Sequence, residues 1–115
     1  MSLEIEQVVL PEHADVKIEL SVTARINVTD VVAQRKVTRL VMDLVGTQLY
    51  GEQPSLVVGR RLVWRVPIWL GLLPQGPIGQ VGAIDVDAQT GEILYTQILL
   101  DELAEHGDAL ARRTT

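Results

Sequence analysis

The most regular pattern in the chain is an alternation of apolar and polar residues across residues 16–28. Every even position is apolar and every odd one is polar, the apolar set being Val16, Ile18, Leu20, Val22, Ala24, Ile26 and Val28. A period of two is that of a β-strand with one buried and one solvated face. Leu3 and Ile5, on either side of Glu4, indicate a shorter edge strand before it.

A helical period replaces the alternation after residue 29. The apolar positions then share one stripe of a helix: Ala33, Val37, Leu40, Val41, Leu44 and Val45. Thr29 or Asp30 can cap the first turn, and Gly46 lies where a helix would end. We therefore predict a helix over residues 30–45.

The middle of the chain is typical of an antiparallel meander. We predict strands at 56–58, 62–70, 81–86 and 92–98, with a long hairpin loop at 73–79 and a turn at 87–91. In the second of these strands one face is wholly apolar and comprises Leu62, Trp64, Val66, Ile68 and Leu70. Because Pro67 has no N–H to donate, we expect this strand to lie at an edge or to bulge at that residue.

A second helix is predicted to begin at Asp101, a residue type that often caps helices. Its apolar stripe is narrow and comprises Leu99, Leu100, Leu103 and Leu110. The acidic residues of its first turn and the basic residues of its last turn suit the helix dipole. We interpret residues 1–98 as one domain and residues 99–115 as a helical tail, which packs either on its own domain or on a partner.

Together these elements predict an α+β fold: an antiparallel sheet of about four to five strands, one helix packed on one face, and a C-terminal helix. The length of 115 residues is that of a single domain with one core. The hydrophobic residues, 47% of the chain, are mostly Val, Leu and Ile, and none is Phe. Such a composition favours a thin core built on a sheet.

Composition and charge argue against several classes of protein. The net charge of −5 argues against binding to a phosphate backbone. The absence of cysteine removes disulfides, thiolate nucleophiles and Cys-ligated zinc. Residues 1–10 lack the pattern of a signal peptide, and no stretch approaches the ~20 apolar residues of a membrane helix. We therefore expect a cytoplasmic protein without a membrane or nucleic-acid partner.

The sequence also lacks a catalytic or metal-binding pattern. Asp85 and Asp87 lie on one face of a strand, but the residues after them do not follow the spacing of a calcium loop, and turn capping explains them better. His13 and His106 have no partner at ligand spacing. The serines lack the glycine-flanked elbow of a hydrolase nucleophile. We predict a non-enzymatic protein with no catalytic residue, no metal ligand and no cofactor.

One stretch resembles a known family. Within residues 81–94, a strand ends at Asp87-Ala88 and turns through Thr90-Gly91-Glu92 into another strand. Trp64 lies in the preceding strand, and the helix at 30–45 precedes both. In this order the chain resembles a PepSY-like domain.

This resemblance covers roughly residues 28–98. It implies the fold of that family and a role as a peptidase regulator or binding module without chemistry of its own. Two features depart from the family. PepSY domains are typically exported or membrane-tethered, whereas we expect no export signal here, and the strand at 16–28 and the C-terminal helix lie outside the motif.

Two surfaces are candidates for contact with a partner. The first is the hairpin around Trp69, since an exposed apolar patch that contains Trp often marks an interface. The alternative is that Trp69 packs under the loop or within a homodimer. The second is the tail helix. The candidate contact residues are Trp69, Leu72, Leu73, Ile78, Leu100, Leu103, Leu110, Arg112 and Arg113.

Three hypotheses for function remain open. The first is a protein-binding or regulatory module of PepSY-like type that forms a homodimer. The second is the antitoxin of a bacterial toxin–antitoxin pair, whose C-terminal helix binds a nuclease toxin. The third is a binder of small apolar ligands, which requires a pocket near Trp64 between helix and sheet.

Overall fold

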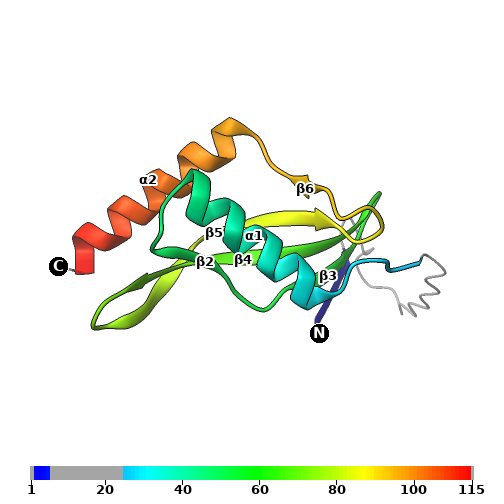
Figure 1. Ribbon diagram of the computed structural model, residues 1–115, viewed down its shortest axis with the longest axis horizontal. Helices are drawn as coiled ribbons and strands as arrows, with labels where there is room; N and C mark the ends of the chain where they lie inside the picture. The colour runs from blue at the N-terminus through cyan, green and yellow to red at the C-terminus, as the bar shows by residue number, and fades with distance from the viewer. Residues whose placement is uncertain (1, 6–24, 115) are drawn as a thin grey trace, which may run out of the picture.

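The computed structural model describes residues 2–5 and 25–114, which form an α+β fold (Figure 1). The elements in chain order are β1 (Ser2–Ile5), α1 (Asp30–Leu44), β2 (Leu49–Gly51), β3 (Ser55–Val58), β4 (Leu62–Leu72), β5 (Gly76–Asp87), β6 (Ile93–Leu94) and α2 (Gln97–Thr114). The predicted fold class is therefore confirmed.

The strands of the described residues form one sheet in the order β1-β3-β4-β5-β6, and β2 also pairs with β4. All pairs are antiparallel except β1 with β3, which is parallel. The edge strand predicted at Leu3 and Ile5 is confirmed as β1. Of the strand predicted at 16–28, residues 16–24 lie outside the described residues, and residues 25–28 belong to neither a helix nor a strand.

The position of β4 corrects the prediction for Pro67. This strand is interior, with β5 on one side and β2 and β3 in succession on the other. Pro67 lies opposite the gap between β2 and β3, where its carbonyl accepts a 2.8 Å hydrogen bond from the N–H of Glu52. A strand residue directs its N–H and C=O to the same side, so the missing N–H of Pro67 faces this interruption. The irregularities of the ladder come later, after Ile68 and after Leu70.

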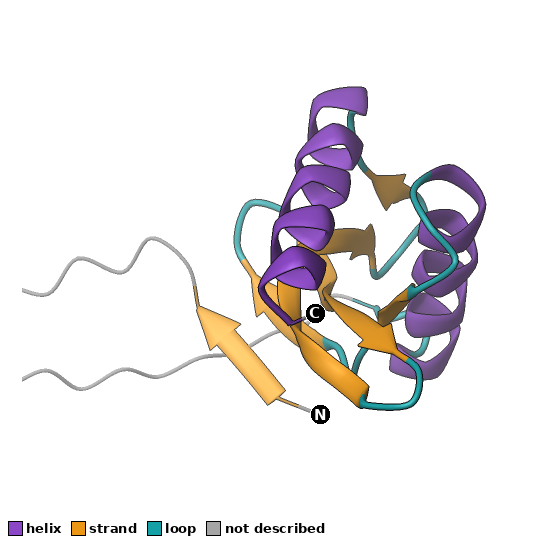
Figure 2. Ribbon diagram, turned by 90° about the vertical axis from the view of Figure 1, so that its left-hand side faces the viewer, coloured by secondary structure: helices purple, strands orange, loops and turns teal. Residues whose placement is uncertain are grey.

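One hydrophobic core lies between the sheet and both helices. The apolar face predicted for β4 is fully buried, and it meets Ala33, Val37 and Val41 of α1 and Leu100 and Leu103 of α2. Figure 2 shows both helices over the same face of the curved sheet. Within the described residues no helix covers the opposite face, which we call the open face.

The first helix has the boundaries that its sequence predicts. The hydroxyl of Thr29 accepts a 3.2 Å hydrogen bond from the N–H of Val32 at the start of the helix. After the last turn, the N–H of Gly46 donates to the carbonyl of Val41. Polar side chains then fix α1 to β2. Gln34 donates to the carbonyl of Gly51, and Thr38 accepts from its N–H.

The second helix begins earlier than predicted. It starts at Gln97 rather than Asp101, because the hydroxyl of Thr96 caps it by accepting from the N–H of Leu99. The predicted last strand, 92–98, is therefore wrong in length, and β6 holds only Ile93 and Leu94.

Glycines on β5 bring α2 against the sheet. A Cβ on Gly82 would lie 2.5 Å from Leu103 Cδ2, and a Cβ on Gly79 would lie 3.1 Å from Leu110 Cδ2. Without these Cβ atoms, the helix lies directly on the strand. The hairpin loop predicted at 73–79 is correspondingly wrong, since only residues 73–75 form the turn and β5 already begins at Gly76.

Candidate functional site

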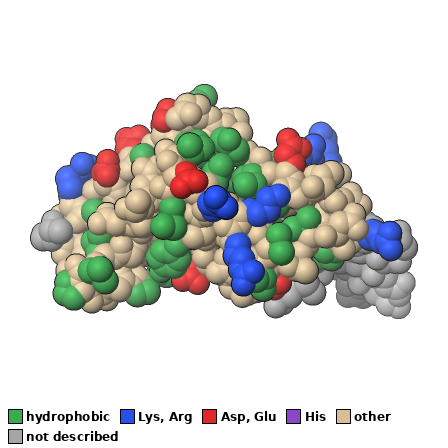
Figure 3. Space-filling view, in the orientation of Figure 1, with side chains coloured by type: hydrophobic (Ala, Val, Ile, Leu, Met, Phe, Trp, Pro, Cys, Tyr) green, Lys and Arg blue, Asp and Glu red, His purple; other side chains and the backbone are tan. Residues whose placement is uncertain are grey.

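The β4–β5 hairpin differs from the rest of the chain in charge. No residue from Val66 to Ile84 is charged, and we call this segment the arm. Its tip, Leu73, is 96% exposed. In Figure 3 hydrophobic side chains lie at the lower left, where Figure 1 places the tip, with no basic or acidic side chain among them; other hydrophobic side chains lie in the middle of the view, beside the basic side chains over α1.

Two aromatic side chains lie together on the open face of the arm. Tyr50 of β2 and Trp69 of β4 are direct partners across the antiparallel pair, so both project to the same side. The ring of Tyr50 also covers Gly71, where a Cβ would lie 3.1 Å from its Cε1 atom. Burial raises the pKa of the Tyr50 hydroxyl, and the negative charge of Glu52 raises it further. Both rings are half-buried, which leaves part of each available for contact.

A hollow of ≈ 640 Å³ lies beside this aromatic pair. Its lining combines the segment before β2 with both strands of the arm: Thr47, Gln48, Tyr50, Gly71, Leu72, Leu73, Gly76 and Pro77. None of these residues is charged. Sequence reasoning missed Tyr50 and the hollow. A usable signal was the uncharged run of residues 44–51, which contains this tyrosine.

The structure divides the predicted contact residues into four groups. Trp69 is half-buried on the open face and Leu73 is exposed at the tip, as a contact surface requires. Leu72, Ile78 and Leu110 are half-buried and pack against the edge of the core. Arg112 and Arg113 are exposed in the last turn of α2.

The prediction that Leu100 and Leu103 contact a partner is corrected. Both side chains are buried in the core, Leu103 to 1% exposure. The apolar stripe of α2 therefore packs on its own sheet. Leu73 and Leu103 have the same chemistry, and only their place in the fold distinguishes an available side chain from one that is already packed.

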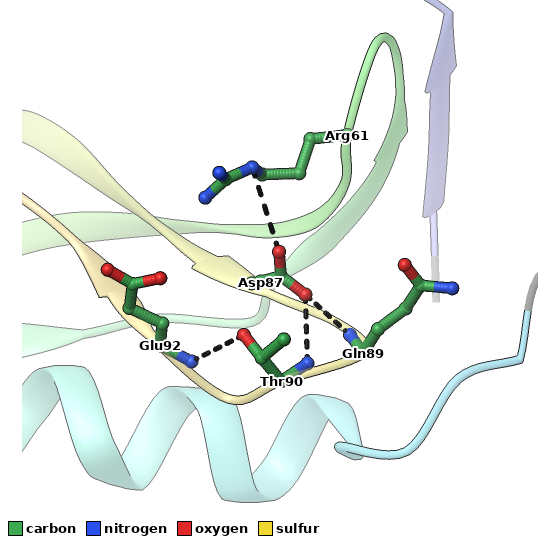
Figure 4. A network of polar contacts seen from close by, with 5 residues as sticks. All are labelled: Arg61, Asp87, Gln89, Thr90 and Glu92. Atoms are coloured by element: carbon green, nitrogen blue, oxygen red, sulfur yellow. Dashed lines mark hydrogen bonds and ion pairs between the residues drawn. The ribbon is translucent and has the colours of Figure 1, made fainter.

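The turn after β5 contains a dense polar network (Figure 4). One carboxylate oxygen of Asp87 accepts from the N–H groups of Gln89 (2.8 Å) and Thr90 (2.9 Å), and the other lies 3.7 Å from Arg61 Nε. Gly91 continues the turn at φ +79°, which favours glycine. These bonds, led by that from Thr90, lower the pKa of Asp87 although its burial opposes the shift. The predicted turn-capping role of Asp87 is confirmed.

This turn also joins distant parts of the chain. Lys36 of α1 donates to the carbonyl of Gly91, and the carbonyl of Ala88 accepts from the backbone of Asn27 and Val28. The indole of Trp64 donates a 2.7 Å hydrogen bond to the carbonyl of Val28. The turn is thus a structural junction in which both carboxylate oxygens of Asp87 already have partners.

The turn-capping role predicted for Asp85 is wrong, because this residue pairs with an arginine. Its two carboxylate oxygens accept from Nε (2.9 Å) and Nη2 (3.0 Å) of Arg65, directly across the β4–β5 pair on the open face. A bidentate pair of this kind fixes both side chains. Neither aspartate is therefore directed at a shared ion.

The described residues contain no cluster of three or more His, Asp or Glu side chains that could hold a metal ion. Every buried side-chain N or O atom among them has a hydrogen-bond partner. His106 contacts the carbonyl of Val81 through Nδ1 (3.0 Å), and His13 lies outside the described residues. Neither α1 nor α2, the helices of this part of the chain, combines the length and the apolar character that a membrane crossing needs.

Comparisons with known proteins give no assignment: no family model, no curated protein and no solved structure matches this chain.

Proposed function

We propose that the chain is a non-enzymatic protein-binding or regulatory module of PepSY-like type, and that the arm is its contact surface. One observation carries the proposal. Leu73 projects, 96% exposed, from the tip of an uncharged arm and borders an uncharged hollow of ≈ 640 Å³. An apolar side chain in this position gains from burial only when a partner covers it.

The composition of the arm supports contact with a protein. Tyr and Trp are enriched at the centres of interfaces because they bury a large area and lose little conformational freedom. Tyr50 and Trp69 supply such rings on a paired sheet, so their backbone is held before a partner arrives. A surface that is ordered in advance loses less entropy on binding.

The residues that carry the PepSY-like resemblance lie at the other end of the sheet and touch one another. Lys36 of α1 donates a hydrogen bond to the carbonyl of Gly91 in the turn. Trp64 donates one to the carbonyl of Val28, just before α1. These two contacts join the residues that carry the resemblance into one scaffold from which the arm projects.

The two other hypotheses find less support. An antitoxin tail requires an apolar stripe that is free to bind a toxin, whereas Leu100 and Leu103 are buried on the sheet. A ligand pocket at Trp64 requires space beside its ring, whereas this side chain is 3% exposed and packed in the core.

A capture experiment with the full chain from a lysate of its native host tests the proposal. The test variant is Leu73→Asp, which places a charge at the tip, and the matched control is Ile98→Asp, since Ile98 is also apolar and 71% exposed but lies on α2. We expect the wild type and Ile98→Asp to capture the same protein and Leu73→Asp to lose it. Retention of that protein by Leu73→Asp, or capture of no protein by the wild type, would contradict the proposal.

A further inference from the structure

We propose that the occupant of the arm is a second copy of this chain, bound about a two-fold axis that runs through the two arms. The inference rests on the proposed function, because it takes the arm as the contact surface, and it names the partner. In a two-fold contact the same patch serves on both sides, so every protrusion must find its receiving hollow within that same patch.

The arm meets this geometric requirement. Leu73 is the protrusion, and the hollow lined by Tyr50, Gly71, Leu72 and Pro77 lies on the same end of the molecule. When two arms meet about a two-fold axis, the Leu73 side chain of each copy can enter the hollow of the other. Both insertions then bury apolar area at once, and the two aromatic pairs lie next to the contact.

The distribution of charge meets a second requirement. Near a two-fold axis a side chain lies close to its own counterpart, so a charged residue there faces a like charge. The stretch from Val66 to Ile84 contains no charge at all, in a chain whose net charge is −5. The arm is thus a surface on which two acidic copies can meet without like charges in direct contact.

The border of the arm offers complementary charges. Leu110 of α2 packs over Gly79, and the neighbouring turns of α2 carry exposed Asp108 and Arg113. Asp108 and Arg113 have opposite charges, so in a symmetric dimer Asp108 of one copy can lie beside Arg113 of the other. A polar border around an apolar centre is the usual composition of a protein interface.

Tryptophan fluorescence offers a local readout of this contact. The chain has two tryptophans, of which Trp64 is buried in the core and Trp69 is half-buried on the arm. Association through the arm removes water from Trp69 and leaves Trp64 unchanged. The emission should therefore shift to shorter wavelength as the protein concentration rises.

Sedimentation equilibrium of the full chain, from micromolar to submillimolar concentration, tests the inference. The wild type and Ile98→Asp should pass from monomer to dimer with the fluorescence shift, whereas Leu73→Asp should raise the dissociation constant on the order of tenfold or more, because a charge would enter an apolar hollow. Leu73→Ser, which adds no charge, should weaken the dimer in the same direction. A wild type that stays monomeric, or a Leu73→Asp variant that dimerises like the wild type, would overturn the inference.

The two proposals fail in distinguishable ways. If the wild type is monomeric but a different protein is captured in a Leu73-dependent way, the arm is a contact surface and the second copy is not its occupant. If the wild type is monomeric and sediments with vesicles of phosphatidylcholine and phosphatidylserine, the occupant is a lipid surface and both proposals are wrong.

Discussion

The two ends of the β4–β5 ribbon are built on different principles. At the end near the Asp87 turn, charged side chains pair across the strands, and Asp87 is only 7% exposed within its hydrogen bonds. At the arm there is no charge, and an apolar side chain projects from the tip. The same pair of strands thus pairs its charged side chains at one end and leaves an apolar side chain exposed to solvent at the other. An end at which charged side chains pair across the strands stabilises the fold, and an end that keeps apolar surface in water is available for binding.

The largest test of this contrast compares two leucines. Leu103→Ala should lower the free energy of unfolding by about 2–5 kcal/mol, because it leaves a cavity where α2 meets Gly82. Leu73→Ala should change that free energy by less than about 0.5 kcal/mol, because its side chain is exposed. Urea unfolding followed by circular dichroism at low protein concentration measures both. Equal losses in the two variants would show that the arm tip is not an independent surface.

A smaller effect is expected where α2 lies on the arm. Gly82→Ala places a methyl group 2.5 Å from Leu103 Cδ2, so the buried Leu103 side chain must repack or α2 must shift, and we expect a loss of about 1–3 kcal/mol. Gly46→Ala is the matched control, since its Cβ would meet nothing within 4 Å. Thermal unfolding of both variants measures the effect, and an unchanged melting temperature for Gly82→Ala would mean that the contact between Gly82 and Leu103 is not tightly packed.

The smallest effect concerns the charged end and its dependence on pH. Because the hydrogen bonds from Thr90 and Gln89 lower the pKa of folded Asp87, its ionised form stabilises the fold above the pKa of the unfolded chain, about 4. This contribution is lost as the pH falls through the lower folded-state pKa. Asp87→Asn keeps an oxygen acceptor but no charge, so we expect a loss of about 1 kcal/mol at neutral pH and a flatter acid dependence.

Unfolding in urea at neutral and acidic pH measures the effect of Asp87→Asn. Asp108→Asn serves as the control, since Asp108 is exposed on α2 and should leave the acid dependence of the wild type in place. If the free energy of unfolding of Asp87→Asn depends on acidic pH as that of the wild type does, Asp87 is not the source of this dependence.

Local signals predicted the elements whose stabilising contacts are near in sequence. The helix over residues 30–45 has its cap, apolar stripe and terminal glycine within its own segment, and α1 forms with nearly those bounds. The turn at Asp87 likewise depends on residues 89–92, which follow it directly. The alternation of β4 identified its buried face because successive strand residues point to opposite sides.

The start of α2 and the role of its leucines could not be predicted in the same way. The sequence predicts a strand over residues 92–98 and a cap at Asp101, whereas the hydrogen bond from the N–H of Leu99 to Thr96 starts the helix four residues earlier. Gly79 falls in the predicted loop, and Gly82 in a predicted strand, in which a glycine carries no sign of its packing role. In the fold they are the positions at which α2 reaches the strand.

The sequence by itself determined the α+β class, α1, the buried face of β4, the capped turn at Asp87 and an uncharged, partly apolar arm. These depend on periodicity, capping and composition, which act over a few residues. Only the tertiary structure decided that Leu103 is core while Leu73 is surface, that Tyr50 stands beside Trp69, and that a hollow lies next to them. Burial and proximity depend on which segments meet in space. The two leucines have identical side chains, and Leu103 is buried only because α2 packs on the sheet.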